Sequence, residues 1–197
     1  FVITNSCTEA LALCLRAVTQ PGDTVAVESP AYYLMLQLLE FLGLKALEIP
    51  TDPRTGMSIE ALDLATRDSR VAACLLVPNA SNPLGSIMPD EHKRRLARLT
   101  AERGVAVIED DIYGDLHFAG ERPWPIKAFD RAGNVMLCSS FSKCLSPALR
   151  IGFVAAGRYR AQLALQKTIT SGGTNPITQQ VLAEYLESGT YERHVRG

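Results

Sequence analysis

The sequence predicts an α/β fold of three layers (αβα), in which helices cover both faces of a mainly parallel sheet. Short apolar runs alternate along the chain with segments whose apolar residues recur at helical spacing. The run at residues 72–77 is apolar at every position, as expected for a strand that is covered on both faces. Because no internal repeat or linker interrupts this alternation, we expect residues 1–197 to form one domain.

The expected elements follow one another in a regular order. We expect strands at residues 1–4, 24–28, 45–50, 72–77, 105–108, 135–138 and 151–155. We expect helices at residues 10–18, 34–42, 59–64, 89–103, 159–169, 177–186 and 191–196. Turn residues separate several of these elements, as at residues 20–23, and residues 51–56 are expected to form a loop.

The composition is that of a globular domain with a sizeable core. The 197 residues are 47% hydrophobic and 21% charged, and the net charge is -1. A chain so close to neutral has no electrostatic footprint for nucleic acid. No apolar run reaches the length that a bilayer requires, so we expect no membrane association.

The cysteines and histidines favour neither a disulfide framework nor a metal site. The five cysteines are odd in number and show no CxxC spacing. Cys14, Cys74 and Cys138 lie within apolar runs and are expected to be reduced core residues, which favours a cytoplasmic location. The three histidines match no ligand motif, so we expect no metal.

Lys143 lies in a serine-rich stretch between the two apolar runs 135–138 and 151–154. Desolvation and a nearby cation such as Arg150 would lower the pKa of this lysine. Its amine would then be a nucleophile able to form a Schiff base. The alternative is a lysine in an ordinary polar loop, and this stretch alone leaves both interpretations open.

The segment before the first helical pattern also has two interpretations. Ser6 and Glu9 fit a capping box, in which the serine accepts a hydrogen bond from the backbone N–H three residues on. A helix N-terminus also presents free N–H groups and a positive dipole end, which together bind phosphate. The hydroxyl groups of Ser6 and Thr8 would add donors, although the sequence alone favours capping.

Polar side chains follow two further predicted strands. Asn82 precedes a proline, which holds it extended so that its amide projects from the strand end; the alternative is a simple turn asparagine. The acidic stretch 109–111 directly follows an apolar strand, and its like charges call for a cation nearby. Metal ligands at suitable spacing are missing, so an organic cation is favoured for Asp110 over a solvated acidic loop.

These groups suit one kind of ligand. Asn82, Asp110 and Lys143 are separated by roughly 30 residues, the length of one βαβ unit. Groups past the carboxyl ends of parallel strands line the ligand crevice of such sheets. An anion site, an aromatic face, an amide, a carboxylate and a lysine at one edge fit a phosphate-bearing pyridine aldehyde. The lysine would form the imine, and the carboxylate would pair with the pyridinium nitrogen.

The order of these motifs resembles a known family. The motifs are Asn82-Pro83-Leu84-Gly85, Asp110-x-x-Tyr113, and Ser140-Phe141-Ser142-Lys143 with Arg150. In combination they resemble the class I/II aminotransferases of fold type I, which use pyridoxal 5'-phosphate, and the match spans almost the whole chain. The resemblance implies the large domain of the PLP-dependent transferase fold.

The resemblance also implies roles for individual residues. Lys143 matches the Schiff-base lysine, and Asp110 is similar to the residue that pairs with the pyridine nitrogen. Asn82 and Tyr113 match the donors to the phenolic oxygen of the ring, and Tyr32 matches the stacking aromatic. The residues that match phosphate contacts are Ser6, Cys7, Thr8, Ser140, Ser142 and Arg150.

Some positions depart from the family pattern or remain ambiguous. Cys7 stands where many members have glycine, and Leu84 replaces a threonine, but backbone N–H groups persist at both places. Tyr33 is the rival of Tyr32 for the stacking position. Thr174 matches the region that lends a phosphate contact to the partner subunit.

Two stretches, residues 19–32 and 189–196, are similar to MocR-type regulators of the GntR group. In those proteins a winged-helix DNA-binding domain precedes an aminotransferase-like domain. The similarity implies an effector domain that binds pyridoxal 5'-phosphate through Lys143 and responds to a small amino compound or to the cofactor itself. It also implies a homodimer and contact with DNA only through a domain outside this chain.

Two other functions remain open. One is a free-standing aminotransferase that transfers an amino group between an amino acid and a 2-oxo acid, and the other is a degenerate fold that binds no cofactor. The chain opens in a strand and stops within a helix, so we expect a piece of a longer protein, without the winged-helix domain and the small C-terminal domain. The family's small domain holds the arginine that binds the substrate carboxylate. We therefore expect little or no transamination by these 197 residues alone.

Overall fold

The computed structural model describes residues 1–118 and 120–196. Its strands are β1 (Val2–Thr4), β2 (Thr24–Ser29), β3 (Lys45–Asp52), β4 (Gly56–Met57), β5 (Val71–Leu76), β6 (Ala106–Asp110), β7 (Val135–Ser140) and β8 (Gly152–Ala155). Its α-helices are α1 (Cys7–Val18), α2 (Tyr33–Phe41), α3 (Ile59–Asp68), α4 (Asp90–Arg103), α5 (Arg160–Ser171), α6 (Pro176–Glu187) and α7 (Thr190–Arg196). Three short 3₁₀ helices are η1 (Ile126–Phe129), η2 (Pro147–Leu149) and η3 (Gly157–Tyr159).

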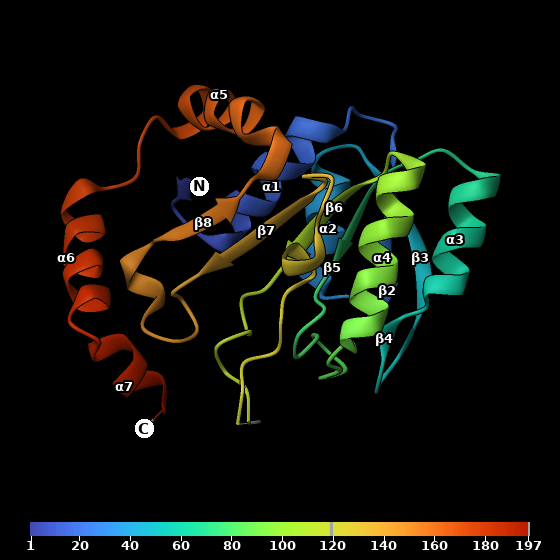
Figure 1. Cartoon of the computed structure of the whole chain (residues 1–197). Helices are drawn as coiled ribbons and strands as arrows, with labels where there is room; N and C mark the ends of the chain where they lie inside the picture. The colour runs from blue at the N-terminus through green and yellow to red at the C-terminus, as the bar shows by residue number, and fades with distance from the viewer. Residues whose placement is uncertain (119, 197) are drawn as a thin grey trace.

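The strands form one eight-stranded sheet in the order β1-β8-β7-β6-β5-β2-β3-β4 (Figure 1). The five strands from β7 to β3 in this order run parallel to their neighbours. Strand β8 is antiparallel to both β7 and β1, and β4 is antiparallel to β3. The α/β class and the mainly parallel sheet are therefore confirmed.

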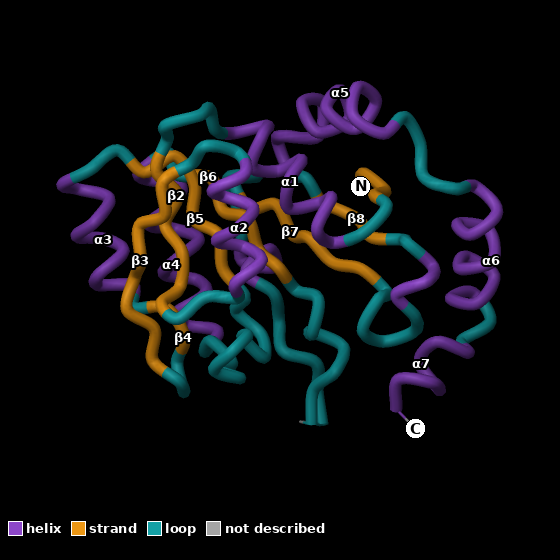
Figure 2. Tube along the Cα trace, turned by 180° about the vertical axis from the view of Figure 1, so that it is seen from behind, coloured by secondary structure: helices purple, strands orange, loops and turns teal. Residues whose placement is uncertain are grey.

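Helices cover both faces of this sheet (Figures 1 and 2). Helices α1, α2 and α5 pack on one face, and α3 and α4 pack on the other. Neighbouring strand residues point to opposite faces: in β6, Ile108 packs in the core on the α1 side and Val107 in the core on the α4 side. The same alternation turns Asp110 towards α1 and Glu109 towards η1.

Helices α6 and α7 lie beyond the side of the sheet that ends in β8 and the edge strand β1 (Figures 1 and 2). Leu182 of α6 is buried and lines an apolar hollow together with Phe1, Ile3 and Phe153. Among the described residues, none of the helices is long and apolar enough to cross a membrane.

Close packing of backbone sets the turn before α1 against the sheet. A Cβ atom on Gly152 would lie 2.7 Å from the carbonyl carbon of Ser6 and 2.8 Å from the carbonyl oxygen of Ser139. Only glycine permits this approach of β8 to the turn. Residues 6–8 are thereby held next to the carboxyl end of β7.

Most predicted elements are found within a few residues of their expected bounds, and two differ in an informative way. Residues 51–56 were expected as a loop, but β3 extends to Asp52 and pairs with β4. Asp52 Oδ1 accepts hydrogen bonds from the backbone N–H groups of Arg54 (2.7 Å) and Thr55 (3.0 Å), which closes a tight hairpin turn. Strand β6 extends to Asp110, so the acidic stretch begins inside the strand.

The predicted core cysteines are confirmed in their burial. Cys14, Cys74 and Cys138 are buried and free of disulfide bonds. Cys14 and Cys138 lie on α1 and β7, and their Sγ atoms are 3.5 Å apart. They pack in the core directly beneath the turn that begins α1.

Candidate functional site

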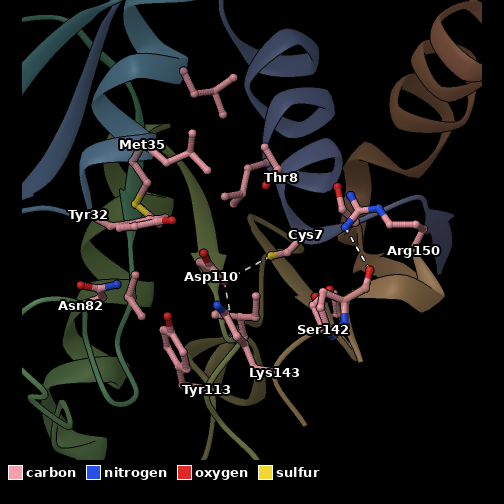
Figure 3. A pocket seen from close by; sticks show the side chains of 18 residues that line it. Cys7, Thr8, Tyr32, Met35, Asn82, Asp110, Tyr113, Ser142, Lys143 and Arg150 are labelled. Carbon is pink, nitrogen blue, oxygen red and sulfur yellow. Dashed lines mark hydrogen bonds between the residues drawn. The ribbon is translucent and has the colours of Figure 1, made fainter. Parts of the chain in front are cut away.

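A cavity of about 220 Å³ lies at the carboxyl ends of the central strands (Figure 3). All eleven of the predicted site residues line it: Ser6, Cys7, Thr8, Tyr32, Asn82, Asp110, Tyr113, Ser140, Ser142, Lys143 and Arg150. Two other residues considered from the sequence do not. Tyr33 is 63% exposed and packs edge-on against Tyr32, with ring centroids 4.8 Å apart, and Thr174 is buried elsewhere.

The topology explains why distant residues meet here. Strands β5, β6 and β7 are parallel neighbours, so Asn82, Asp110 and Lys143 follow strand ends at the same edge. Strand β1 is antiparallel to β8, which is antiparallel to β7, and β1 therefore points to this edge too. The turn at residues 6–8 consequently opens into the same cavity.

Asp110 is the buried carboxyl group of the cavity. Its Oδ1 accepts hydrogen bonds from the thiol of Cys7 (3.3 Å) and from the backbone N–H of Ile112 (3.1 Å). Burial raises the pKa of Asp110 to about 6, and these two hydrogen bonds oppose the rise. Since both bonds end on Oδ1, a cationic donor in the cavity would find Oδ2 available.

The Cys7 thiol keeps its proton in this environment. Burial raises the pKa of Cys7 well above its usual value, and the nearby Asp110 carboxylate raises it further. Cys7 therefore donates its S–H to Asp110 rather than competing with it as a second anion. The sequence placed Cys7 only among phosphate contacts, so its bond to Asp110 was missed.

The turn before α1 both caps the helix and faces the cavity. Ser6 Oγ accepts a hydrogen bond from the backbone N–H of Glu9 at 3.0 Å, which confirms the predicted cap. The Glu9 carboxylate accepts from the backbone N–H of Asn5 (2.5 Å) and pairs with Lys167 (2.9 Å). A hydroxyl that accepts one bond still has a proton to donate, so capping and anion binding are compatible at Ser6.

The opposite wall brings further donors to this turn. Arg150 has a left-handed backbone (φ 51°) at the end of η2, and its Nη1 donates weakly to the carbonyl of Pro147 at 3.4 Å. Ser142 lies on the same side of the cavity as Arg150 (Figure 3), and Ser140 also lines the cavity. A guanidinium group, hydroxyl groups and a helix N-terminus make a donor set that suits a phosphate group.

Lys143 reaches the cavity from the loop after β7. The sequence left open whether this amine is desolvated, and the structure shows the Lys143 side chain exposed. The residue lies in the loop between β7 and β8, beyond the carboxyl end of β7, and it lines the cavity.

An apolar wall completes the cavity. Leu11 of α1 and Met35 and Leu38 of α2 line it beside the ring of Tyr32. The sequence predicted the helix that carries Leu38 but did not connect it with a ligand. The helical spacing of residues 34–42 was the available signal.

A buried polar network supports the cavity from the other face of the sheet. Lys93 Nζ donates to Asn79 Oδ1 (2.8 Å), and Asn79 Nδ2 donates to Asp111 Oδ1 (2.9 Å). Arg122 Nη2 donates to Asp111 Oδ2 at 2.5 Å. The network joins α4 to the loops that follow β5 and β6, which carry Asn82 and Tyr113. Nothing in the sequence pattern announced it, because lysine on a helix is usually exposed.

Burial perturbs several ionisable groups around this network. It lowers the pKa of Lys93. It raises the pKa of Glu109 to about 8, with Asp111 adding to the rise, and it raises the pKa of Glu28 to about 7. Glu109 accepts backbone N–H bonds from Ile126 (2.6 Å) and Lys127 (2.9 Å), which oppose the rise.

The cavity fits a phosphorylated pyridine aldehyde chemically. An amine and a carboxylate with an available oxygen lie on one side, donors for a phosphate lie on another, and an aromatic ring with apolar side chains forms the wall. The family model for aminotransferase class I and II matches residues 1–194. The chain belongs to this family.

Relatives of two kinds share this domain. The HTH-type transcriptional regulator YjiR of Escherichia coli (strain K12) is 47% identical over 99% of this chain and 42% of its own length. Aromatic-amino-acid aminotransferase 1 of Thermococcus litoralis is 32% identical over 98% of this chain and 47% of its own length. The chain thus spans less than half the length of these relatives.

Solved structures of the family share the fold. The Pyrococcus horikoshii kynurenine aminotransferase, solved in complex with PMP, superposes with a TM-score of 0.91 and 34% identity. The match covers 98% of this chain and 49% of that one. The fold and the family are therefore established for the domain. Both transcriptional regulators and aminotransferases share it.

Proposed function

We propose that residues 1–197 are the aminotransferase-like large domain of a MocR-type regulator of the GntR group, and that they bind pyridoxal 5'-phosphate as a Schiff base on Lys143. The observation that carries the proposal is the convergence of Lys143, Asp110 and the donors of the α1 turn on one cavity. Similarity to the regulator YjiR supports the regulatory part.

The residues would divide the work of holding the cofactor. Lys143 would bind its aldehyde carbon, and Asp110 would pair with the ring nitrogen. Asn82 and Tyr113 would donate to the phenolic oxygen, and Tyr32 would stack on the ring. The phosphate would be held by Ser6, Cys7, Thr8, Ser140, Ser142 and Arg150.

When bound, pyridoxal 5'-phosphate supplies an electron sink for chemistry on amino compounds. The chain's own residues would set its electronic state. A ring nitrogen that carries a proton would favour the ionised form of Asp110, because an opposite charge nearby lowers the pKa of a carboxyl group. The wall of Tyr32, Met35 and Leu38 would exclude water from one face of the ring.

The partners follow from the same proposal. The effector would be a small amino compound or the cofactor itself, and DNA would be contacted by a domain outside this chain. We propose a homodimer in the cytoplasm, in keeping with the reduced thiols and the regulator relatives.

The test is covalent trapping on Lys143. The chain would be incubated with pyridoxal 5'-phosphate, reduced with borohydride and mapped by peptide mass spectrometry. We expect the added mass on the peptide that holds Lys143, no trapping there in K143A, and unchanged trapping in K45A, which removes an exposed lysine of β3. An unmodified wild-type chain would contradict the proposal and support a domain without cofactor.

A free-standing aminotransferase is the second candidate, supported by the 32% identity to the Thermococcus litoralis enzyme. The cavity residues serve both functions, so the complete protein must decide. Sequence-specific DNA binding that changes with an amino compound would support the regulator. Transfer of amino groups to a 2-oxo acid at an enzymatic rate, without DNA binding, would support the enzyme instead.

A further inference from the structure

Helix α7 contains the segment 190–196, whose sequence resembles the regulators but which does not line the cavity. It packs against the loop that carries Lys143 instead. The Tyr191 ring meets the ring of Phe141 edge-on, with centroids 5.7 Å apart. Phe141 is two residues before Lys143, so the contact falls at the start of the loop.

Two polar contacts hold the other side of Lys143. The Tyr191 hydroxyl lies 3.2 Å from Cys144 Sγ, and His194 Nε2 lies 3.0 Å from the carbonyl oxygen of Cys144. Cys144 directly follows Lys143 in the chain. Helix α7 therefore contacts the loop on both sides of the lysine.

A second line of contacts joins α7 to the strand that bears Asp110. The Tyr191 hydroxyl donates to Asp115 Oδ2 at 2.5 Å, and Arg122 pairs with Asp115 Oδ1 at 2.6 Å. Arg122 also pairs with Asp111 at 2.5 Å. One tyrosine hydroxyl thus lies between the loop of Lys143 and the network next to Asp110.

The loop has few other ties near the lysine. Leu145 and Ser146 donate backbone N–H bonds to the Phe141 carbonyl at 2.9 and 3.2 Å, which closes the turn locally. The Lys143 side chain itself is exposed. Contacts from outside the loop fix its orientation. At Phe141 they come from the Ile151 carbonyl, which accepts its backbone N–H at 3.3 Å, and from the ring of Phe153 as well as from α7, whereas α7 supplies those at Cys144.

We propose that Tyr191 and His194 are positioning residues, through which α7 holds the Lys143 loop and aims the amine into the cavity. The proposal rests on the proposed function, because the orientation of Lys143 matters for function only if this lysine binds the cofactor. A shift of α7 would change the order of the loop and the rate at which Lys143 reacts with an aldehyde. Any segment that contacts and shifts α7 would thereby influence the cofactor site.

The test compares Y191F with Y185F. The first removes the hydroxyl and keeps the ring against Phe141; the second removes a hydroxyl on α6 that makes no hydrogen bond among the described residues. Amide hydrogen exchange of the peptide 139–150 is measured without cofactor. We expect exchange about threefold to tenfold faster in Y191F, as for the loss of one or two hydrogen bonds, with unchanged exchange in the core of α4.

The second readout is the rate of trapping by pyridoxal 5'-phosphate and borohydride at Lys143. It should fall in Y191F and in H194A and stay at the wild-type value in Y185F. Wild-type exchange and trapping rates in both Y191F and H194A would overturn the inference while leaving the proposed function intact. Faster exchange in Y191F together with no trapping in any chain, wild type included, would uphold the loop contact and reject the proposed function.

Discussion

The end of β6 carries two adjacent carboxyl groups, Asp110 and Asp111, that meet opposite environments. Asp110 turns towards α1 and the cavity, where its bonds come from a thiol and one backbone N–H, both on Oδ1. Asp111 joins the network on the other side, where Asn79 binds Oδ1 and Arg122 binds Oδ2. Both carboxyl groups are buried, so partners rather than depth distinguish them.

The difference separates a supporting group from a binding group. Asp111 has strong donors on both oxygens, which compensate the cost of burying a charge. Asp110 has weaker donors, and burial raises its pKa to about 6, so ionising it costs more free energy than ionising an exposed aspartate. A carboxylate whose ionisation costs free energy until a cationic ligand pairs with it is typical of a functional site.

The largest effect is expected from D111N. The substitution removes the negative charge that compensates the half-exposed Arg122 and, through Asn79, the buried Lys93. We expect a loss of about 3–5 kcal/mol in the free energy of unfolding, as for other broken buried ion pairs. Urea denaturation of the unliganded chain measures it.

The matched control for this prediction is E60Q. Glu60 pairs with Arg95 at 2.7 Å, but its side chain is 72% exposed. Exposed ion pairs contribute little to stability, so E60Q should remain close to wild type. Equal losses in D111N and E60Q would refute the supporting role given to Asp111.

The second prediction concerns D110N, for which we expect a gain rather than a loss in the free energy of unfolding. Between about pH 4, near the ordinary pKa of aspartate, and pH 6, the folded chain binds more protons at Asp110 than the unfolded chain. Stability therefore falls as pH rises through this window, and the cost is complete above pH 6. D110N removes the cost and should stabilise the unliganded chain by about 1–3 kcal/mol at neutral pH.

Urea denaturation at several pH values separates this effect from repacking. The difference between D110N and wild type should be small near about pH 4, where both side chains are neutral, and should grow up to pH 6. The same variant should retain pyridoxal 5'-phosphate more weakly. A gain in stability that is independent of pH would mean that ionisation of Asp110 is not its source.

The sequence located the cavity residues well because strand order translates directly into position. Asn82, Asp110 and Lys143 each follow an apolar strand, and parallel neighbours end at one edge. Successive residues at the end of β6 point to opposite faces of the sheet, which separates Asp110 from Asp111. The sequence could not predict this separation, because it did not show where the strand ends. The boundary was expected at residue 108, two residues early.

The remaining contacts depend on packing between distant segments. Lys93 is buried because α4 presses it against Asn79, and no periodicity distinguishes it from an exposed helical lysine. The exposure of Lys143, in the loop after β7, likewise could not be read from the sequence pattern. Cys7 is 103 positions from Asp110 in the chain, so only the fold shows that its thiol donates a hydrogen bond to that carboxyl group.

The smallest effect is expected from C7A, which tests what sets Asp110 apart. The Cys7 thiol donates to Asp110 Oδ1 at 3.3 Å and thereby lowers the pKa of the carboxyl group. Without this donor we expect the pKa of Asp110 to rise by about half a unit to one unit, the scale of one weak hydrogen bond to a charge. Carbon-13 NMR of labelled aspartate carboxyl groups in the unliganded chain measures it, with D110N to assign the signal.

The serine variant is the decisive companion of C7A, because both shorten the side chain and only one keeps a donor. C7S presents an O–H where the thiol was and should return the pKa of Asp110 towards the wild-type value of about 6. A shift shared by C7A and C7S would assign the effect to the lost volume of sulfur, and no shift in either would remove Cys7 from the control of Asp110. Since neither measurement needs the cofactor, the result bears on the carboxyl group itself.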